Sequence, residues 1–122
     1  MSNFETFFKS YIETALWCSH DINNDENDDS SLENQNYSID DFDNKSLDSL
    51  HKDCVSFFSN NFEMIKDNPS LAGHDFFLTQ NHHGAGFWDG DWEKEIGQEL
   101  TEESHKYSEH TFYVNDGVVY CD

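Results

Sequence analysis

The sequence contains no arginine, a single proline and few cations of any kind. Its 122 residues include six lysines against 26 aspartates and glutamates, so the formal net charge is −20 at pH 7. Arginine is the side chain best suited to phosphate contacts and to reading base edges, and its absence argues against direct binding of DNA or RNA. An anionic membrane surface would also repel the chain. We therefore expect its partner to be a protein.

Long apolar runs and closely spaced cysteines are also missing. No window approaches the roughly 18 apolar residues of a membrane-spanning helix, and the N-terminal residues lack the basic and apolar regions of a secretion signal. Cys18, Cys54 and Cys121 are far apart, which favours ordinary core cysteines over a disulfide framework, a zinc ribbon or a nucleophile. These features predict a soluble cytoplasmic protein, and the length predicts one domain over residues 1–122.

Aromatic residues make up 16% of the chain, which predicts a packed core despite the charge. An apolar stripe with helical spacing predicts a helix over residues 3–19. A second stripe follows a capping box at Ser38 and predicts a helix of about 20 residues that ends before Asn68-Pro69. Between the two helices, the Asp- and Asn-rich residues 20–37 predict an acidic loop.

The pattern changes in the second half of the chain. Residues 75–81 and 87–90 are expected to form short strands around a glycine-containing turn, and Asp89 or Asp91 is expected to cap a third helix. Asp116-Gly117 predicts a type I′ turn in a closing hairpin. The order α-α-β-β-α-β-β predicts an α+β fold, with three helices and a small antiparallel sheet of about four strands.

The negative charge is concentrated in residues 21–48 and 89–122, which hold ten acidic residues each. Duplex DNA carries one charge per ~1.7 Å of axis, so twenty carboxylates match roughly one helical turn. Such a surface is suited to a basic DNA-binding groove, with Phe42, Trp88 or Trp92 as apolar anchors. The alternative is that the charge serves solubility or adaptation to salt. The expected partner-facing carboxylates are Asp25, Glu26, Asp28, Asp29, Glu33, Asp40, Asp41, Asp43, Asp48, Glu93, Glu95, Glu99, Glu102 and Glu103.

A second candidate site lies in "GHDFFLTQNHHGAGFWDGDW", residues 73–92. If its two expected strands pair, the side chains beside the turn would converge into a ligand site or orient a histidine as a general base. The spacing matches no zinc motif, and the loop from Asp21 lacks the Gly and Glu of an EF-hand, so no metal or cofactor is predicted. The alternative is that the polar residues cap a turn and the aromatic residues fill the core. The alternative ligand site comprises His74, Asp75, His83, Trp88 and Asp89.

The same segment carries a family resemblance. "AGHDFFLTQNHHGAGFWDG", with "FFKSYIETALW" near the start and "YVNDGVVY" near the end, resembles a family of small acidic proteins encoded mostly by bacteriophages, whose function is not established. That family usually carries Trp at the position of Phe77 and Arg at the position of Gln80. This chain has therefore lost a cation beside its central motif, which puts in doubt any binding of an anionic ligand there.

The resemblance and the charge together imply a function. Small acidic phage proteins act against restriction enzymes, CRISPR effectors, DNA-repair enzymes and nucleoid proteins, all of which have basic nucleic-acid channels. We therefore expect a non-enzymatic DNA mimic, monomeric or homodimeric, in the cytoplasm of an infected bacterium. Its expected partner is a host DNA- or RNA-binding protein with a basic cleft. The alternatives are a small enzyme or ligand-binding domain built on residues 74–91, and a virion or assembly protein.

Overall fold

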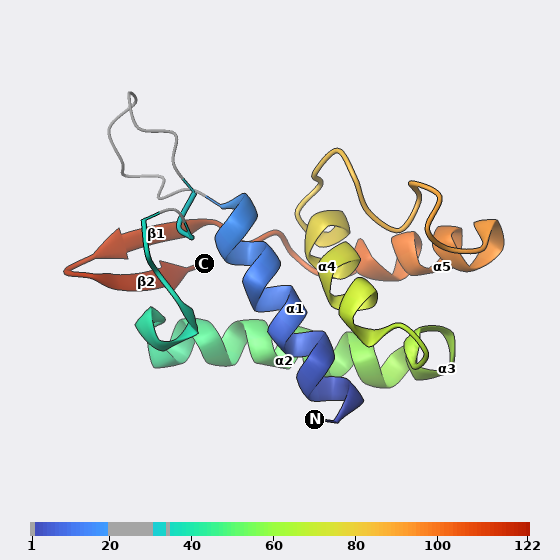
Figure 1. The fold of residues 1–122 in the computed structure, drawn as a ribbon, viewed down its shortest axis with the longest axis horizontal. Coiled ribbons are helices and arrows are strands. Elements are labelled where there is room, and N and C mark those ends of the chain that lie inside the picture. The colour runs from blue at the N-terminus through green and yellow to red at the C-terminus, as the bar shows by residue number, and fades with distance from the viewer. Residues whose placement is uncertain (1, 20–30, 34) are drawn as a thin grey trace.

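The described part of the chain, residues 2–19, 31–33 and 35–122 of a computed structural model, is mostly helical (Figure 1). Within it, the only sheet is a two-stranded antiparallel hairpin. The predicted α+β fold with about four strands and three helices is therefore wrong. The elements are α1 (Asn3–Cys18), the 3₁₀ helix η1 (Ile39–Asp41), α2 (Asn44–Asn60), α3 (Phe62–Ile65), α4 (Pro69–Gln80), α5 (Lys94–Ser104), β1 (Phe112–Asn115) and β2 (Val118–Cys121).

Helix α1 confirms the helix predicted over residues 3–19. Ser2 caps it, because the Ser2 hydroxyl accepts a hydrogen bond from the backbone N–H of Glu5 at 3.1 Å. The α1 face that carries Phe7 and Tyr11 packs directly on α4. A Cβ atom placed on Gly73 of α4 would lie 2.1 Å from the carbonyl oxygen of Phe7. Glycine at this position therefore permits the close crossing of the two helices.

The second predicted helix is divided into three pieces. The capping box at Ser38 is present, with its backbone N–H donating to Asp41 Oδ2 at 2.8 Å, but it begins η1. Helix α2 begins one turn later with Asp43 as its N-cap residue. Its end is marked by Asn61, whose side-chain amide donates to the carbonyl oxygen of Phe57 at 3.0 Å, and α3 follows.

Residues 75–80 belong to α4 and do not form the predicted strand. The helix begins at Pro69, a residue whose fixed φ suits the first helical turn. Every residue from Asp75 to Gln80 is buried. A helix enclosed on all sides has no amphipathic period, so its apolar run is easily mistaken for a strand. Residues 81–93 are turns and bends, which also overturns the predicted strand at 87–90, and α5 begins after Glu93.

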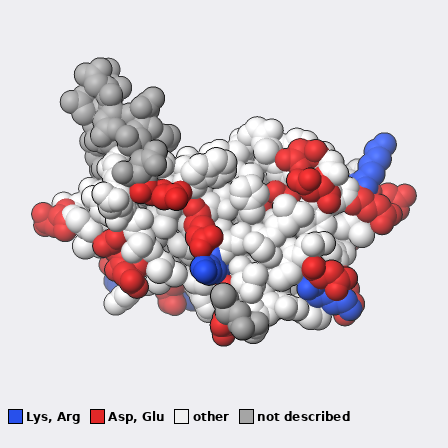
Figure 2. All heavy atoms as spheres, in the orientation of Figure 1, with Lys and Arg blue, Asp and Glu red and all other residues white. Residues whose placement is uncertain are grey.

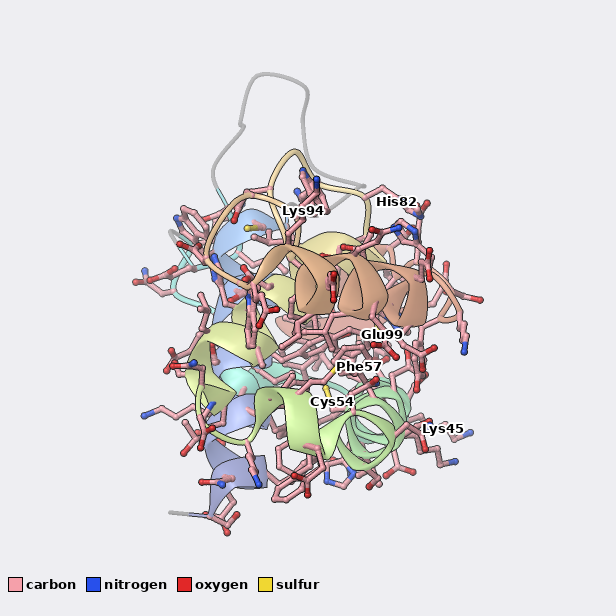
Figure 3. All side chains as sticks on the ribbon, turned by 90° about the vertical axis from the view of Figure 1, so that its right-hand side faces the viewer. Lys45, Cys54, Phe57, His82, Lys94 and Glu99 are labelled. Carbon is pink, nitrogen blue, oxygen red and sulfur yellow. The ribbon has the colours of Figure 1, made fainter. Side chains whose placement is uncertain are left out.

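Stacked aromatic rings form the core between α1, α2 and α4. The rings of Phe57 and Phe76 lie 4.0 Å apart between centroids, and Phe7 stacks against both of them. Figure 3 shows Cys54 and Phe57 projecting from α2 into this interior, where both are fully buried. The Cys54 thiol is thus part of the core, and burial raises its pKa well above the usual value.

The closing hairpin is confirmed. Asp116 and Gly117 have φ angles of +52° and +76°, as a type I′ turn requires. The hairpin also touches the region of η1 and α2, because the backbone N–H of Asp43 donates to the carbonyl oxygen of Val119 at 2.8 Å. These contacts fix the hairpin, η1 and the start of α2 at one end of the molecule, whereas α5 extends toward the other end (Figure 1). No helix in the described residues has the length and apolar character needed to cross a lipid bilayer.

Candidate functional site

The structure assigns separate partners to the histidines and aspartates of residues 73–92. His74 Nδ1 lies 3.0 Å from Thr14 Oγ1 of α1. The adjacent Asp75 is buried and accepts a hydrogen bond from Trp92 Nε1 at 2.8 Å. Burial raises the pKa of Asp75, and the hydrogen bond from Trp92 acts in the opposite direction. This contact ties α4 to the segment that leads into α5.

The other members of the predicted ligand site lie in the turn after α4. The His83 ring packs against the Phe77 ring at 5.9 Å between centroids, and burial lowers the pKa of His83. Asp89 Oδ2 accepts a hydrogen bond from the backbone N–H of Gly86 at 3.3 Å. Among the described residues, no three His, Cys, Asp or Glu side chains are grouped to hold a metal ion. The predicted ligand site depended on the pairing of two strands, and residues 75–90 form no strands. The ligand site stays a prediction.

A buried polar network, which no sequence pattern indicated, joins four separated parts of the chain. Gln80 is fully buried, and its side-chain oxygen accepts a hydrogen bond from the Tyr11 hydroxyl at 2.6 Å. The Gln80 side-chain nitrogen donates to Asp53 Oδ2 at 2.8 Å. His110 Nε2 lies 2.8 Å from the same carboxylate oxygen, and His110 Nδ1 lies 2.7 Å from the carbonyl oxygen of Asp122. The network connects α1, α2, α4 and the residues around the hairpin.

The network carries a balanced pair of charges. Desolvation lowers the pKa of His110, but its hydrogen bonds with Asp53, Cys121 and the Asp122 carbonyl outweigh that effect and raise the pKa to about 10. His110 is therefore protonated at neutral pH and neutralises Asp53. Gln80 faces the partly buried carboxylate of Asp53, so its role in this fold is in the core.

The expected partner-facing carboxylates that the structure describes are divided between elements at the two ends of the molecule (Figure 1). One group lies on η1 and the start of α2, and the other lies on α5. Asp25, Glu26, Asp28 and Asp29 fall outside the described residues. Of the remainder, Glu33, Asp40, Asp48, Glu93, Glu95, Glu99 and Glu102 are exposed, whereas Asp41, Asp43 and Glu103 are half-buried.

Three of these carboxylates have local structural partners. Asp41 accepts from the backbone of Ser38, Asp43 accepts from the backbone N–H of Ser46 at 3.1 Å, and Glu103 pairs with Lys106. Figure 2 shows one face of the molecule, on which the Asp and Glu side chains form separate groups with uncharged surface between them. The charge is therefore distributed over several patches on this face.

The expected aromatic anchors have different environments. Phe42 is buried with its ring edge-to-face against Phe112, so the expectation that it anchors a partner is wrong. Trp92 is half-buried and bonded to Asp75. Trp88 is 48% exposed and remains available for contact. Trp17, which the helical stripe of α1 did not single out, is 58% exposed.

A groove of about 880 Å³ runs beside α1, and its lining includes Trp17. The helix supplies apolar side chains to it, and residues from three other parts of the chain, among them Tyr37, His51 and His74, complete the lining. The sequence predicted α1 but not the groove, because its walls come from segments far apart in the chain.

Comparisons of the chain with protein-family models, with curated proteins and with solved structures find no match. The function is therefore argued from the charges and contacts of the molecule itself.

Proposed function

We propose that the protein is an acidic decoy that occupies the basic nucleic-acid-binding surface of a partner protein and excludes nucleic acid from it. The observation that carries this proposal is the row of exposed carboxylates on α5, at one end of the molecule. In this role the protein catalyses no reaction. Its effect depends on occupying the partner's site.

The exposed carboxylates of α5 are spaced on the same scale as the phosphates of a nucleic-acid strand, although somewhat more widely. The exposed acidic residues of the helix, Glu95, Glu99 and Glu102, span about 10 Å of its axis, or one carboxylate per ~5 Å. One strand of duplex DNA carries one phosphate per ~3.4 Å of axis. Glu95, Glu99 and Glu102 fall within a sector of roughly 60° of the helix surface, since each residue turns the helix by about 100°. They can therefore face one partner together.

Nearby lysines neutralise little of the row, although Lys106 interacts electrostatically with Glu102. Figure 3 shows Lys94 and Glu99 on different sides of α5. Lys106 is paired with Glu103 at the end of the helix. Over the described ranges, no lysine forms an ion pair with Glu95, Glu99 or Glu102. A basic partner would meet these carboxylates without displacing an internal cation.

A contact of ordinary size fits on one end of the molecule. A typical interface covers about 800 Å² on each partner, compared with 6983 Å² for the whole surface of this protein. The α5 row and the carboxylates of η1 and α2 lie at different ends, so they do not form a single contact of that size. We assign the decoy contact to α5, because Asp41 and Asp43 in the other group already cap helices.

The experiment compares two triple variants of equal net charge. Glu95→Gln/Glu99→Gln/Glu102→Gln removes the α5 row, and Glu33→Gln/Asp40→Asn/Asp48→Asn removes three exposed carboxylates elsewhere. Each tagged protein is used to capture proteins from a bacterial lysate freed of nucleic acid, with elution by salt or by duplex DNA. We expect the wild type and the second variant to retain a nucleic-acid-binding protein that DNA displaces, and the α5 variant to lose it.

The captured protein is then purified and its binding to labelled DNA is measured with each variant as competitor. Inhibition that requires the α5 carboxylates would establish the decoy. Equal losses in both triple variants would show that only net charge matters and would favour the solubility interpretation. Capture that DNA does not displace would contradict the proposal.

A further inference from the structure

The groove beside α1 has the dimensions of a site for a helix. Its lining extends along α1 from Phe4 to Trp17, a separation of thirteen residues that corresponds to about 20 Å of helix axis. A partner helix of about 14 residues would match this length. Amphipathic helices commonly bind by laying their apolar face into a groove of this kind.

The floor of the groove is apolar and partly exposed. Phe8 and Ile12 of α1 contribute to it, and Trp17 and Ile39 lie at the surface with exposures of 58% and 39%. Trp17 and Ile39 are two of only five large apolar side chains that are exposed among the described residues. An apolar patch bordered by polar residues is typical of a protein-binding site, and an exposed tryptophan is a common anchor.

The charges around the groove select the occupant. Three carboxylates, those of Glu5, Glu13 and Glu33, take part in its lining. The one lysine in the lining, Lys9, lies 3.9 Å from Glu13, so the lysine and the three carboxylates together leave the lining with two negative charges. With a net charge of −20, the protein would repel an acidic or anionic occupant. A helix with apolar residues on one face and lysine or arginine beside them fits this groove. Its apolar face would contact the apolar floor, and its cations would lie near the carboxylates of the lining.

We propose that the α1 groove binds a basic amphipathic helix of a partner protein, with Trp17 as its anchor. This inference goes beyond the proposed function, because the groove takes its lining from α1, residues 33 and 37–39, His51 and His74 and none of it from α5. The groove contact is largely apolar and would persist at salt concentrations that weaken the α5 contact. The two contacts would therefore respond differently to salt.

The test uses a labelled 14-residue peptide with leucines on one helical face, lysines on the other and no tryptophan. An isomer with the same composition but dispersed leucines controls for net charge. Fluorescence anisotropy gives the Kd of each peptide for the wild type, for Trp17→Ala and Ile39→Ser, and for the matched exposed-tryptophan control Trp88→Ala. We expect the amphipathic peptide to bind at least about tenfold more tightly than its isomer. Trp17→Ala should remove most of that difference, and Trp88→Ala should not.

Equal binding of the two peptides, or equal losses in the two tryptophan variants, would overturn the proposal. So would a homodimer, detected by sedimentation, that Trp17→Ala dissociates, because the occupant would then be a second copy. The triple α5 variant separates this inference from the decoy. If it loses DNA-displaceable capture but binds the peptide normally, both proposals stand. If the wild type binds the peptide but captures nothing that DNA displaces, the proposal for the α1 groove is supported and the decoy proposal is contradicted.

Discussion

His110 Nε2 lies 2.8 Å from Asp53 Oδ2, and this contact joins the chain just before β1 to the middle of α2. The His110 side chain is only 6% exposed, so the charges are held away from water. Gln80 donates to the same carboxylate oxygen from α4. One partly buried carboxylate thus connects three segments that are distant in the sequence. Its loss should lower the free energy of unfolding of the whole domain.

The ion pair of His110 and Asp53 should make the stability of the protein depend on pH. Histidine in an unfolded chain has a pKa near ~6.5. In the folded protein the pKa of His110 is raised to about 10. The stabilisation is therefore complete below pH ~6.5, decreases as the pH rises and is lost above about 10. Urea unfolding at several pH values should give a decline in the free energy of unfolding over this interval. The exposed-histidine control His105→Gln should keep the decline, and His110→Gln should remove it.

Asp53→Asn should destabilise the protein by about 2–3 kcal/mol, because it leaves a protonated histidine without its counter-charge in a site that is largely shielded from water. The cost is less than for a fully buried pair, since the Asp53 side chain is 26% exposed. Denaturant unfolding at pH 7 gives the loss, and NMR titration of the imidazole should show a lower His110 pKa. A variant as stable as the wild type, with an unchanged titration, would mean that the ion pair is not formed in solution.

The sequence patterns predicted those elements whose signals are local. Helix α1 has an amphipathic stripe, and the hairpin has Asp116-Gly117 at its turn, so each could be inferred from neighbouring residues. Helix α4 could not, because burial on all sides removes the helical period and leaves an apolar run that resembles a strand. Because residues 75–80 form a helix, the strand pairing that the predicted ligand site required is absent.

The candidate site was predictable only in part. The acidic residues of α5 were recognised from composition and spacing, since charge needs no tertiary information. The buried network was not, because Gln80 and His110 acquire their roles from contacts across 27 to 69 positions of the chain. The groove at Trp17 was missed for the same reason. Trp17 belongs to α1, whose apolar residues were interpreted as core. Its exposure depends on how the segments distant in sequence pack around α1, which no local pattern predicts.

Substitutions of Trp92 and Asp75 test how the buried Asp75 carboxylate affects stability. Trp92→Phe keeps the aromatic packing against Phe87 but removes the N–H that donates to Asp75, and it should cost about 1–3 kcal/mol at pH 7. Asp75→Asn keeps an acceptor for the indole and removes the desolvated charge, so its stability at pH 7 should equal or exceed that of the wild type.

The same carboxylate has a definite pH signature. The folded-state pKa of Asp75 is raised by burial, so the folded protein holds this proton to a higher pH than the unfolded chain does. Ionisation of Asp75 therefore subtracts stability as the pH rises from the ordinary aspartate value of ~3.9 through the raised value. Unfolding curves of Asp75→Asn should lack that decrease relative to the wild type. A large loss of stability in Asp75→Asn at pH 7 would show instead that the charged form is the one the fold requires.

Gly73→Ala tests the crossing of α1 and α4. A methyl group at this position would lie 2.1 Å from the carbonyl oxygen of Phe7 and 3.1 Å from the backbone nitrogen of Tyr11, and backbone atoms cannot move aside as a flexible side chain can. The two helices must separate, and overpacking of this kind typically costs about 1–3 kcal/mol, which exceeds the gain of up to about 1 kcal/mol from replacing glycine in a helix. Gly84→Ala is the matched control, because nothing lies within 4 Å of its added Cβ. Thermal unfolding should show a lower Tm for Gly73→Ala and little change for Gly84→Ala. If Gly73→Ala were as stable as the wild type, the helices would have to cross at a greater distance in solution, and the stacked rings of Phe7 and Phe76 between them would have to lie farther apart.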